Sequence, residues 1–99
     1  MTEPTREILY ADGRREPLPD DAVGNMAAIE RLIGADGVDI VPLRRKGIEG
    51  WIMIADDNGM SDGRPENRAA TSIYHTHYPT AIFPIAGDVV ICRNDDFQF

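Results

Sequence analysis

The sequence predicts an α+β fold: a single domain, spanning 1–99, with a mixed or antiparallel sheet of about five strands, one long helix and one short helix. Three observations support this class. The chain has 99 residues, which is the size of one domain. Apolar residues recur at helical spacing in one segment, 22–33. Two other segments, 50–55 and 89–92, are apolar on both faces, as expected of central strands covered on two sides.

The N-terminal residues predict a hairpin at one edge of the sheet. Glu7–Tyr10 is a candidate strand, and Asp12–Gly13 is a favourable tight turn after it. Arg14–Leu18 can then return as the partner strand. Because proline donates no backbone hydrogen bond, Pro17 and Pro19 are expected to keep this strand at a sheet edge or to end it.

The long helix is expected over about residues 22–33. Asp20 or Asp21 can accept hydrogen bonds from the unpaired N–H groups at its start, and Gly34 is a natural residue to follow its end. The apolar residues at helical spacing are Val23, Met26, Ile29, Leu32 and Ile33. We expect their side chains to face the core.

Two strands are predicted to follow, joined by the polar connection Arg44–Gly47. The first runs from Val38 to about Leu43, and the second is Gly50–Ala55. In the second strand, one face carries Trp51, Met53 and Ala55, and the other carries Ile52 and Ile54. Apolar side chains on both faces indicate a central strand.

The last third of the sequence predicts a bent strand or a strand pair. Ala81–Ile85 and Asp88–Arg93 flank Ala86–Gly87, where the glycine allows a turn or a bulge. Phe97 and Phe99 follow, and we expect them to dock onto the core, with a partner-binding tail as the alternative.

Composition and charge restrict the classes of function. The 42 % apolar and 27 % charged residues are ordinary for a soluble globular protein, and no apolar run approaches the roughly 20 residues of a membrane-spanning helix. The N-terminal residues lack the pattern of a signal peptide, and the single cysteine, Cys92, has no partner for an internal disulfide, so we expect a cytoplasmic location. The net charge of −7 argues against direct binding to a nucleic-acid backbone. The charge predicts a solvated acidic surface. The alternative is a decoy, in which the carboxylates occupy the positions where a DNA-binding partner expects phosphates.

The segment 56–71 is almost devoid of large apolar side chains, which is unusual in so short a chain. Loops longer than about a dozen residues are usually functional or disordered. Asn58–Gly59 is a turn signal near its start, and Pro65 or Glu66 is expected to begin the short helix, with 68–71 as its body. We therefore look for the functional site in this segment.

Four residues of the segment are candidate binding residues: Arg64, Asn67, Arg68 and Thr71. Arginine offers a planar fork of donors suited to carboxylate or phosphate, and asparagine supplies a donor and an acceptor together. If the four side chains face one groove, a ligand or a partner protein can use them. The structural alternative is that Asn67 caps the short helix.

The sequence contains no compelling catalytic constellation and no cofactor-binding motif. Asp56 and Asp57 are adjacent on a strand and therefore point to opposite faces, which makes them poor catalytic partners. His75 and His77 would share a face if the chain is extended there, but nothing in the sequence places a third metal ligand beside them. We predict surface or edge-strand histidines, no metal site and no cofactor. Cys92 lies among apolar residues, where a buried thiol is inert.

Several segments occur in a distinctive order: MAAIERLIGADGVDIVPL, GWIMIADDNG, Pro65–Thr71 with the pattern P-x-N-R-x-A-T, and IAGDVVI. This order resembles a small family of uncharacterised proteins, a domain of unknown function common in phages, plasmids and other mobile elements. The chain departs from the family at Cys92–Asn94, where a second glycine or a short polar turn is usual, and at the aromatic stretch Tyr74–Tyr78. The resemblance implies a fold and a genomic setting rather than a chemistry.

We therefore expect a non-enzymatic accessory protein of a phage or mobile element that acts by binding a host protein. An enzymatic role stays open, and one alternative is a small metal-dependent hydrolase that uses the His75/His77 pair. Another is a binder of a small anionic ligand through Arg64 and Arg68. The two terminal phenylalanines are compatible with a homodimer.

Overall fold

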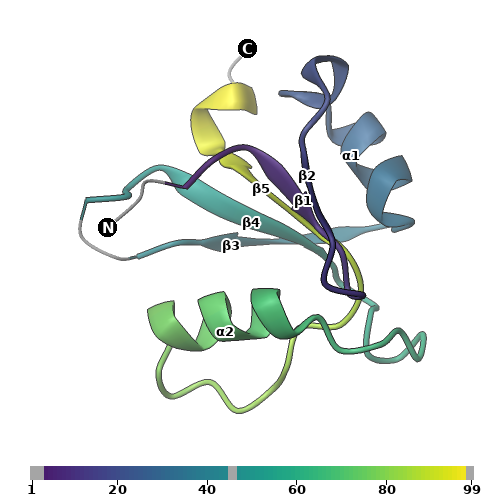
Figure 1. Ribbon diagram of the computed structural model, residues 1–99, viewed down its shortest axis with the longest axis vertical. Helices are drawn as coiled ribbons and strands as arrows, with labels where there is room; N and C mark the ends of the chain where they lie inside the picture. Colours follow the sequence, from purple (N-terminus) through teal and green to yellow (C-terminus); the bar gives the residue numbers. More distant parts are fainter. Residues whose placement is uncertain (1–3, 45–46, 98–99) are drawn as a thin grey trace.

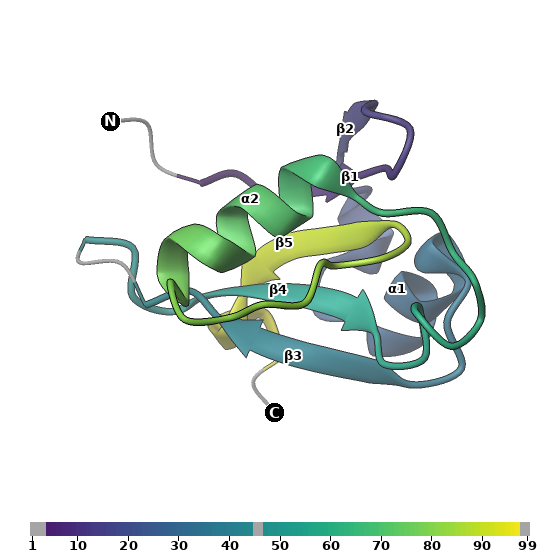
Figure 2. The ribbon, with the colours of Figure 1, turned by 90° about the horizontal axis from the view of Figure 1, so that it is seen from below.

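The computed structural model describes residues 4–44 and 47–97. In chain order its elements are β1 (Glu7–Leu9), β2 (Arg15–Pro17), the 3₁₀ turn η1 (Asp20–Ala22), α1 (Met26–Ile33), β3 (Val38–Pro42), β4 (Trp51–Asp56), α2 (Arg68–His77), β5 (Val89–Arg93) and the 3₁₀ turn η2 (Asn94–Phe97). The five strands form one antiparallel sheet in the order β2-β1-β5-β4-β3. One helix covers each face of the sheet, α1 on one side and α2 on the other (Figure 1, Figure 2). The predicted α+β class and sheet are confirmed.

The two central strands are buried on both faces because a helix lies on each side of them. Alternate residues of β4 enter separate clusters: Ile52 and Ile54 pack with α1, and Met53 and Ala55 pack in the cluster that contains Ala70 of α2. β5 lies between β1 and β4, and four of its five residues are buried. The predicted central position of both strands is confirmed.

The sheet ends in two unlike edge strands. β2 is three residues long, all of them exposed, and contains Pro17, as the sequence predicts for an edge. β3 is the opposite edge, five residues long, and pairs only with β4. The two edges therefore offer different lengths of unpaired backbone.

α1 begins later than the sequence predicts. Asp20–Ala22 forms a separate 3₁₀ turn, so neither predicted aspartate caps α1. Gly24 follows with a φ of 71°, a left-handed conformation that interrupts a continuous helix. Asn25 then caps α1, because its side-chain oxygen accepts a backbone N–H hydrogen bond at 3.1 Å. The predicted Gly34 does end the helix, with a φ of 69°.

α2 is longer than the short helix that the sequence predicts, with 10 residues against 8 in α1. Its helix continues through the aromatic stretch because Ala70 and Ile73 lie at helical spacing and pack on the sheet. It ends at His77, with Tyr78 as the C-cap residue directly before Pro79. The condition under which His75 and His77 would share a face, an extended chain at this point, is therefore not met.

The predicted strand at 81–85 does not form. Both sides of β5 are already paired, with β1 and with β4, so the sheet has no free edge beside it. The segment instead runs over β4 on the α2 side (Figure 2), and Ala86 makes a single bridge to Glu66. It forms a wall of the pocket described below.

The remaining predictions concern single residues. Phe97 is half-buried against the α1-side cluster, as predicted, whereas Phe99, Arg45 and Lys46 lie outside the described residues. Cys92 is fully buried, and its burial raises the pKa of the thiol to about 12, so the nucleophilic thiolate is scarce at neutral pH. Within 4–44 and 47–97, no helix is long and apolar enough to cross a membrane.

Asn67 is completely buried and connects three parts of the chain. Its side-chain amide donates to the backbone carbonyls of Leu9 and Gly87, each at 2.9 Å. Its side-chain oxygen accepts from the N–H of Ala70 at 3.0 Å and so caps α2, which confirms the predicted cap. Its own N–H donates to the carbonyl of Ile85 at 2.8 Å. One residue thus joins the end of β1, the chain before β5 and the start of α2.

Replacing Asn67 with alanine is expected to destabilise the protein by about 2–4 kcal/mol, because two carbonyls and one N–H lose buried hydrogen bonds. Asn25→Ala is the matched control, since Asn25 makes the equivalent cap on α1 at an exposed position. That substitution should cost about 1 kcal/mol. Urea unfolding of the two variants measures the difference. Equal losses would show that Asn67 acts as an ordinary helix cap only.

Candidate functional site

The polar segment 56–71 is an ordered structure rather than a loose loop. The N–H of Gly59 donates to the carbonyl of Asp56, and the N–H of Asp62 donates to the carbonyl of Asn58. The N–H of Arg64 then returns to the carbonyl of Gly59 at 3.0 Å. These bonds close a compact turn between β4 and α2.

Arg64 fixes this turn against the other side of the sheet. Its Nε lies 2.8 Å from Oδ2 of Asp56, whose side chain is only 2 % exposed. The two atoms form an ion pair without an aligned N–H···O hydrogen bond. The rest of the guanidinium donates to the carbonyls of Ile33, at 3.2 Å, and of Gly34. Arg64 thereby supplies donors to the C-terminal end of α1 while it neutralises a buried carboxylate.

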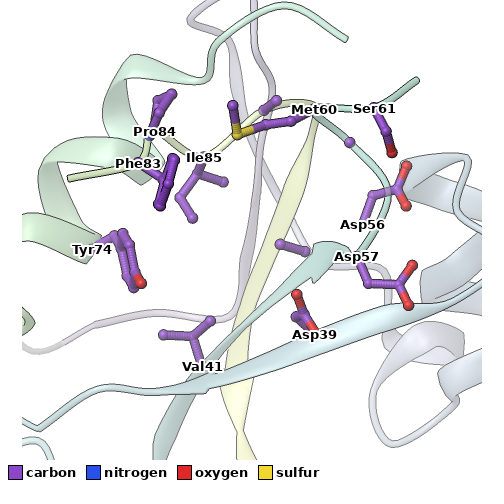
Figure 3. A pocket seen from close by; sticks show the side chains of 13 residues that line it. Asp39, Val41, Asp56, Asp57, Met60, Ser61, Tyr74, Phe83, Pro84 and Ile85 are labelled. Carbon is purple, nitrogen blue, oxygen red and sulfur yellow. The ribbon is translucent and has the colours of Figure 1, made fainter. Parts of the chain in front are cut away.

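A pocket of about 370 Å³ lies beside the turn, on the α2 side of the sheet. Asp39 and Val41 of β3 and Ala55 of β4 form its floor, and Tyr74 of α2 with the chain 83–86 forms one wall. Figure 3 shows Tyr74 and Phe83 facing Val41 across the hollow, with Met60 of the turn at one end. The segment that is unusual in sequence therefore borders a real concavity.

Large apolar side chains stand exposed around this pocket. Phe83 is 63 % exposed and Met60 is 56 % exposed, and both line it. Ile82, next to Phe83, is 80 % exposed. Exposed apolar groups that gather around a concavity mark binding surfaces more often than scattered ones do.

Two carboxylates at the pocket make no ion pair with a cation among the described residues. Asp39 rises from β3 into the hollow (Figure 3). Asp57 lies at the pocket's end and accepts a hydrogen bond from Asn58 at 2.9 Å. Its carboxylate also packs over Gly37, where an added Cβ would lie 3.0 Å from Oδ2. The pocket therefore combines an apolar lining with negative charge.

The C-terminal half of α2 is tied to β3 below the pocket. The Tyr78 hydroxyl donates to the carbonyl of Pro42 at 2.6 Å, and the Arg44 guanidinium lies 5.1 Å from the Tyr78 ring centre. Tyr74 contacts Tyr78, with ring centres 5.3 Å apart. These contacts hold the Tyr74 wall at a set distance from the edge strand.

The four predicted binding residues do not surround one groove. Arg64 is engaged with Asp56 and α1, and Asn67 is inside the protein. The Thr71 hydroxyl accepts from the N–H of Ile85 at 2.9 Å and so holds the pocket wall to α2. Arg68 is exposed and lines a smaller hollow on the other side of α2, beside the β1–β2 turn. Three of the four therefore build the surroundings of the pocket, and none lines it.

The two histidines lie near the C-terminal end of α2, where residues two apart point to different sides. His75 Nε2 is 3.1 Å from the carbonyl of Phe83, and His77 Nδ1 accepts from the N–H of Arg44. They do not share a face. In the part of the chain that the structure describes, no three histidine, cysteine, aspartate or glutamate residues group as metal ligands.

No family model, curated protein or solved structure matches the chain. The assignment of the candidate site therefore depends on the geometry of this structure alone. Asp39, Tyr74 and Phe83 were not among the predicted site residues; they come from β3, from α2 and from the irregular chain after α2. The one signal that pointed to them was the polar segment that borders the pocket.

Replacing Arg64 with alanine is expected to cost about 2–3 kcal/mol, because the buried Asp56 carboxylate loses its cation. Arg14→Ala is the control, since Arg14 pairs with Asp12 at an exposed position. That substitution should leave the free energy of unfolding nearly unchanged, because solvent screens an exposed ion pair. Urea unfolding gives both values.

A double-mutant cycle with Asp56→Ala separates the pair from the carbonyl contacts of Arg64. The cost of the double variant should be smaller than the sum of the single costs by about 1 kcal/mol or more. Additive costs would mean that the ion pair does not stabilise the turn.

Proposed function

We propose that the protein is a non-enzymatic binding module whose pocket between β3 and α2 docks a partner protein. The observation that carries the proposal is the coincidence of three features at one place: a hollow of mixed polar and apolar lining, exposed Phe83 and Met60, and the carboxylates of Asp39 and Asp57, which make no ion pair with any described residue. Apolar anchors beside polar groups are typical of protein interfaces. The one serine hydroxyl that lines the hollow, that of Ser61, donates to the backbone carbonyl of Asn58 at 3.2 Å rather than to a carboxylate.

The framework of the pocket supports binding without a large rearrangement. Asn67, Thr71 and Arg64 hold its walls by buried or half-buried hydrogen bonds and an ion pair. A preformed site loses less conformational entropy when it binds than a flexible one does. This rigidity favours a docking surface over a loop that orders on contact.

We propose a host protein as the partner because the sequence resembles a family common in phages, plasmids and other mobile elements. The acidic chain, with a net charge of −7, suits a basic partner surface better than a nucleic-acid backbone. A cytoplasmic setting belongs to the same proposal, because the free, buried thiol of Cys92 fits a reducing compartment.

A photo-crosslinking amino acid placed at position 83 should capture one host protein in cells of the native host. The same group at Val23 is the control, because Val23 is also exposed but follows η1 on the α1 side of the sheet. Phe83→Ser should lower recovery of the captured protein at least tenfold, whereas Val23→Ser should leave it unchanged.

Both variants change exposed side chains, so their melting temperatures should match that of the parent. Capture from position 23 but not from position 83, or recovery that Phe83→Ser leaves unchanged, would rule out this pocket as the docking site.

A further inference from the structure

We infer that the partner contributes an extended, basic segment that adds to the sheet as a sixth strand beside β3. This inference rests on the proposed function and specifies the chemistry of the partner. It follows from the backbone of the edge strand and from the charge of the side chains beside it.

The hydrogen-bond register shows which backbone groups of β3 are available. The N–H of Leu43 donates to the carbonyl of Trp51, and the N–H of Asp57 donates to the carbonyl of Gly37. Bonded pairs alternate along an antiparallel ladder, so Asp39 and Val41 also direct their backbone groups toward β4. Val38 and Ile40 consequently direct theirs away from the sheet.

No described strand covers that outer side of β3 (Figure 2). Pro42 has no N–H, and its carbonyl accepts from Tyr78, so the available stretch is bounded at one end. The opposite edge strand, β2, is shorter and contains Pro17. The backbone of β3 therefore offers the longer template for strand addition.

The side chains of β3 define what the added strand carries. Asp39 and Val41 project to the pocket side, and Ile40 projects to the other side, where it is 49 % exposed. A lysine or arginine opposite Asp39 would also approach Asp57, and apolar residues would lie opposite Val41 and Ile40. A second basic residue opposite Gly37 would meet the Asp57 carboxylate that lies over this glycine. Read along an antiparallel strand from the residue opposite Val41 to the residue opposite Gly37, the pattern is apolar, apolar, basic, any residue, basic.

A second copy of the chain is a poor occupant of this edge. Two copies of β3 paired antiparallel about Asp39 would place two carboxylates opposite each other, and pairing about Ile40 would place Asp39 opposite Val41. Each copy also has a net charge of −7. Charge complementarity therefore selects a basic segment from a different protein.

Synthetic peptides test the inference directly. The basic probe is acetyl-SVVKTKS-amide, which carries the expected pattern, and the matched control is acetyl-SVVETES-amide. Titration into the ¹⁵N-labelled full chain should shift the amide signals of Val38 and Ile40 with the basic probe. Its Kd should be at least tenfold below that of the acidic control, and Asp39→Asn should raise the Kd about threefold or more.

Backbone methylation distinguishes strand addition from simple charge attraction. Methylating the amide of the second valine, which lies opposite Ile40, should abolish binding of the basic probe. Methylating the first lysine, whose N–H points away from β3, should have little effect. Equal loss in the two methylated probes, or equal affinity for the basic and acidic probes, would overturn the inference.

The peptide experiments can fail while the crosslinking experiment at position 83 succeeds, so the two proposals are tested separately. Capture of a host protein through position 83, together with failure of the peptides, would leave the pocket as a docking site and remove the added strand. Concentration-dependent dimerisation of the chain that shifts Ile40 without a probe would identify a second copy as the occupant and would equally overturn the inference.

Discussion

The fold depends on the buried amide of Asn67, which is hydrogen-bonded to the carbonyls of Leu9 and Gly87 and to the N–H of Ala70. These partners belong to the end of β1, the chain before β5 and the first turn of α2. A buried amide that satisfies three backbone groups is costly to leave unpaired, so the three chain segments have one compatible arrangement. This arrangement sets where α2 lies on the sheet.

The pocket follows from that arrangement. Once α2 is fixed, Thr71 holds the chain at Ile85, and Tyr74 and Tyr78 set the spacing between α2 and β3. On the other side, Arg64 secures the turn after β4 to Asp56 and to the end of α1. The hollow is therefore bounded by segments that are each tied to the core, and the edge of β3 beside it remains accessible.

Local sequence patterns predicted the parts of the fold that depend on local chemistry. The alternation in β4, the proline-marked edge at β2 and the cap at Asn67 were all visible as patterns. The length of α2 was not, because packing of Ile73 on the sheet overrides the modest helix propensity of the aromatic stretch. The pocket was not predicted either. Its residues, such as Asp39 and Phe83, lie far apart in the chain, and Arg64 faces the end of α1 rather than a groove.

Native-state hydrogen exchange measured residue by residue tests whether Asn67 locks these segments into one cooperative unit. The amides to compare are those of Asn67, Ala70 and Gly87, which donate to Ile85, to the Asn67 side chain and to Pro65. If Asn67 locks the segments together, these three amides exchange only through global unfolding, with opening free energies equal to those of the β4–β5 amides. Exchange of these three amides by local opening, while the amides of β4 and β5 stay protected, would show that Asn67 does not lock the segments together.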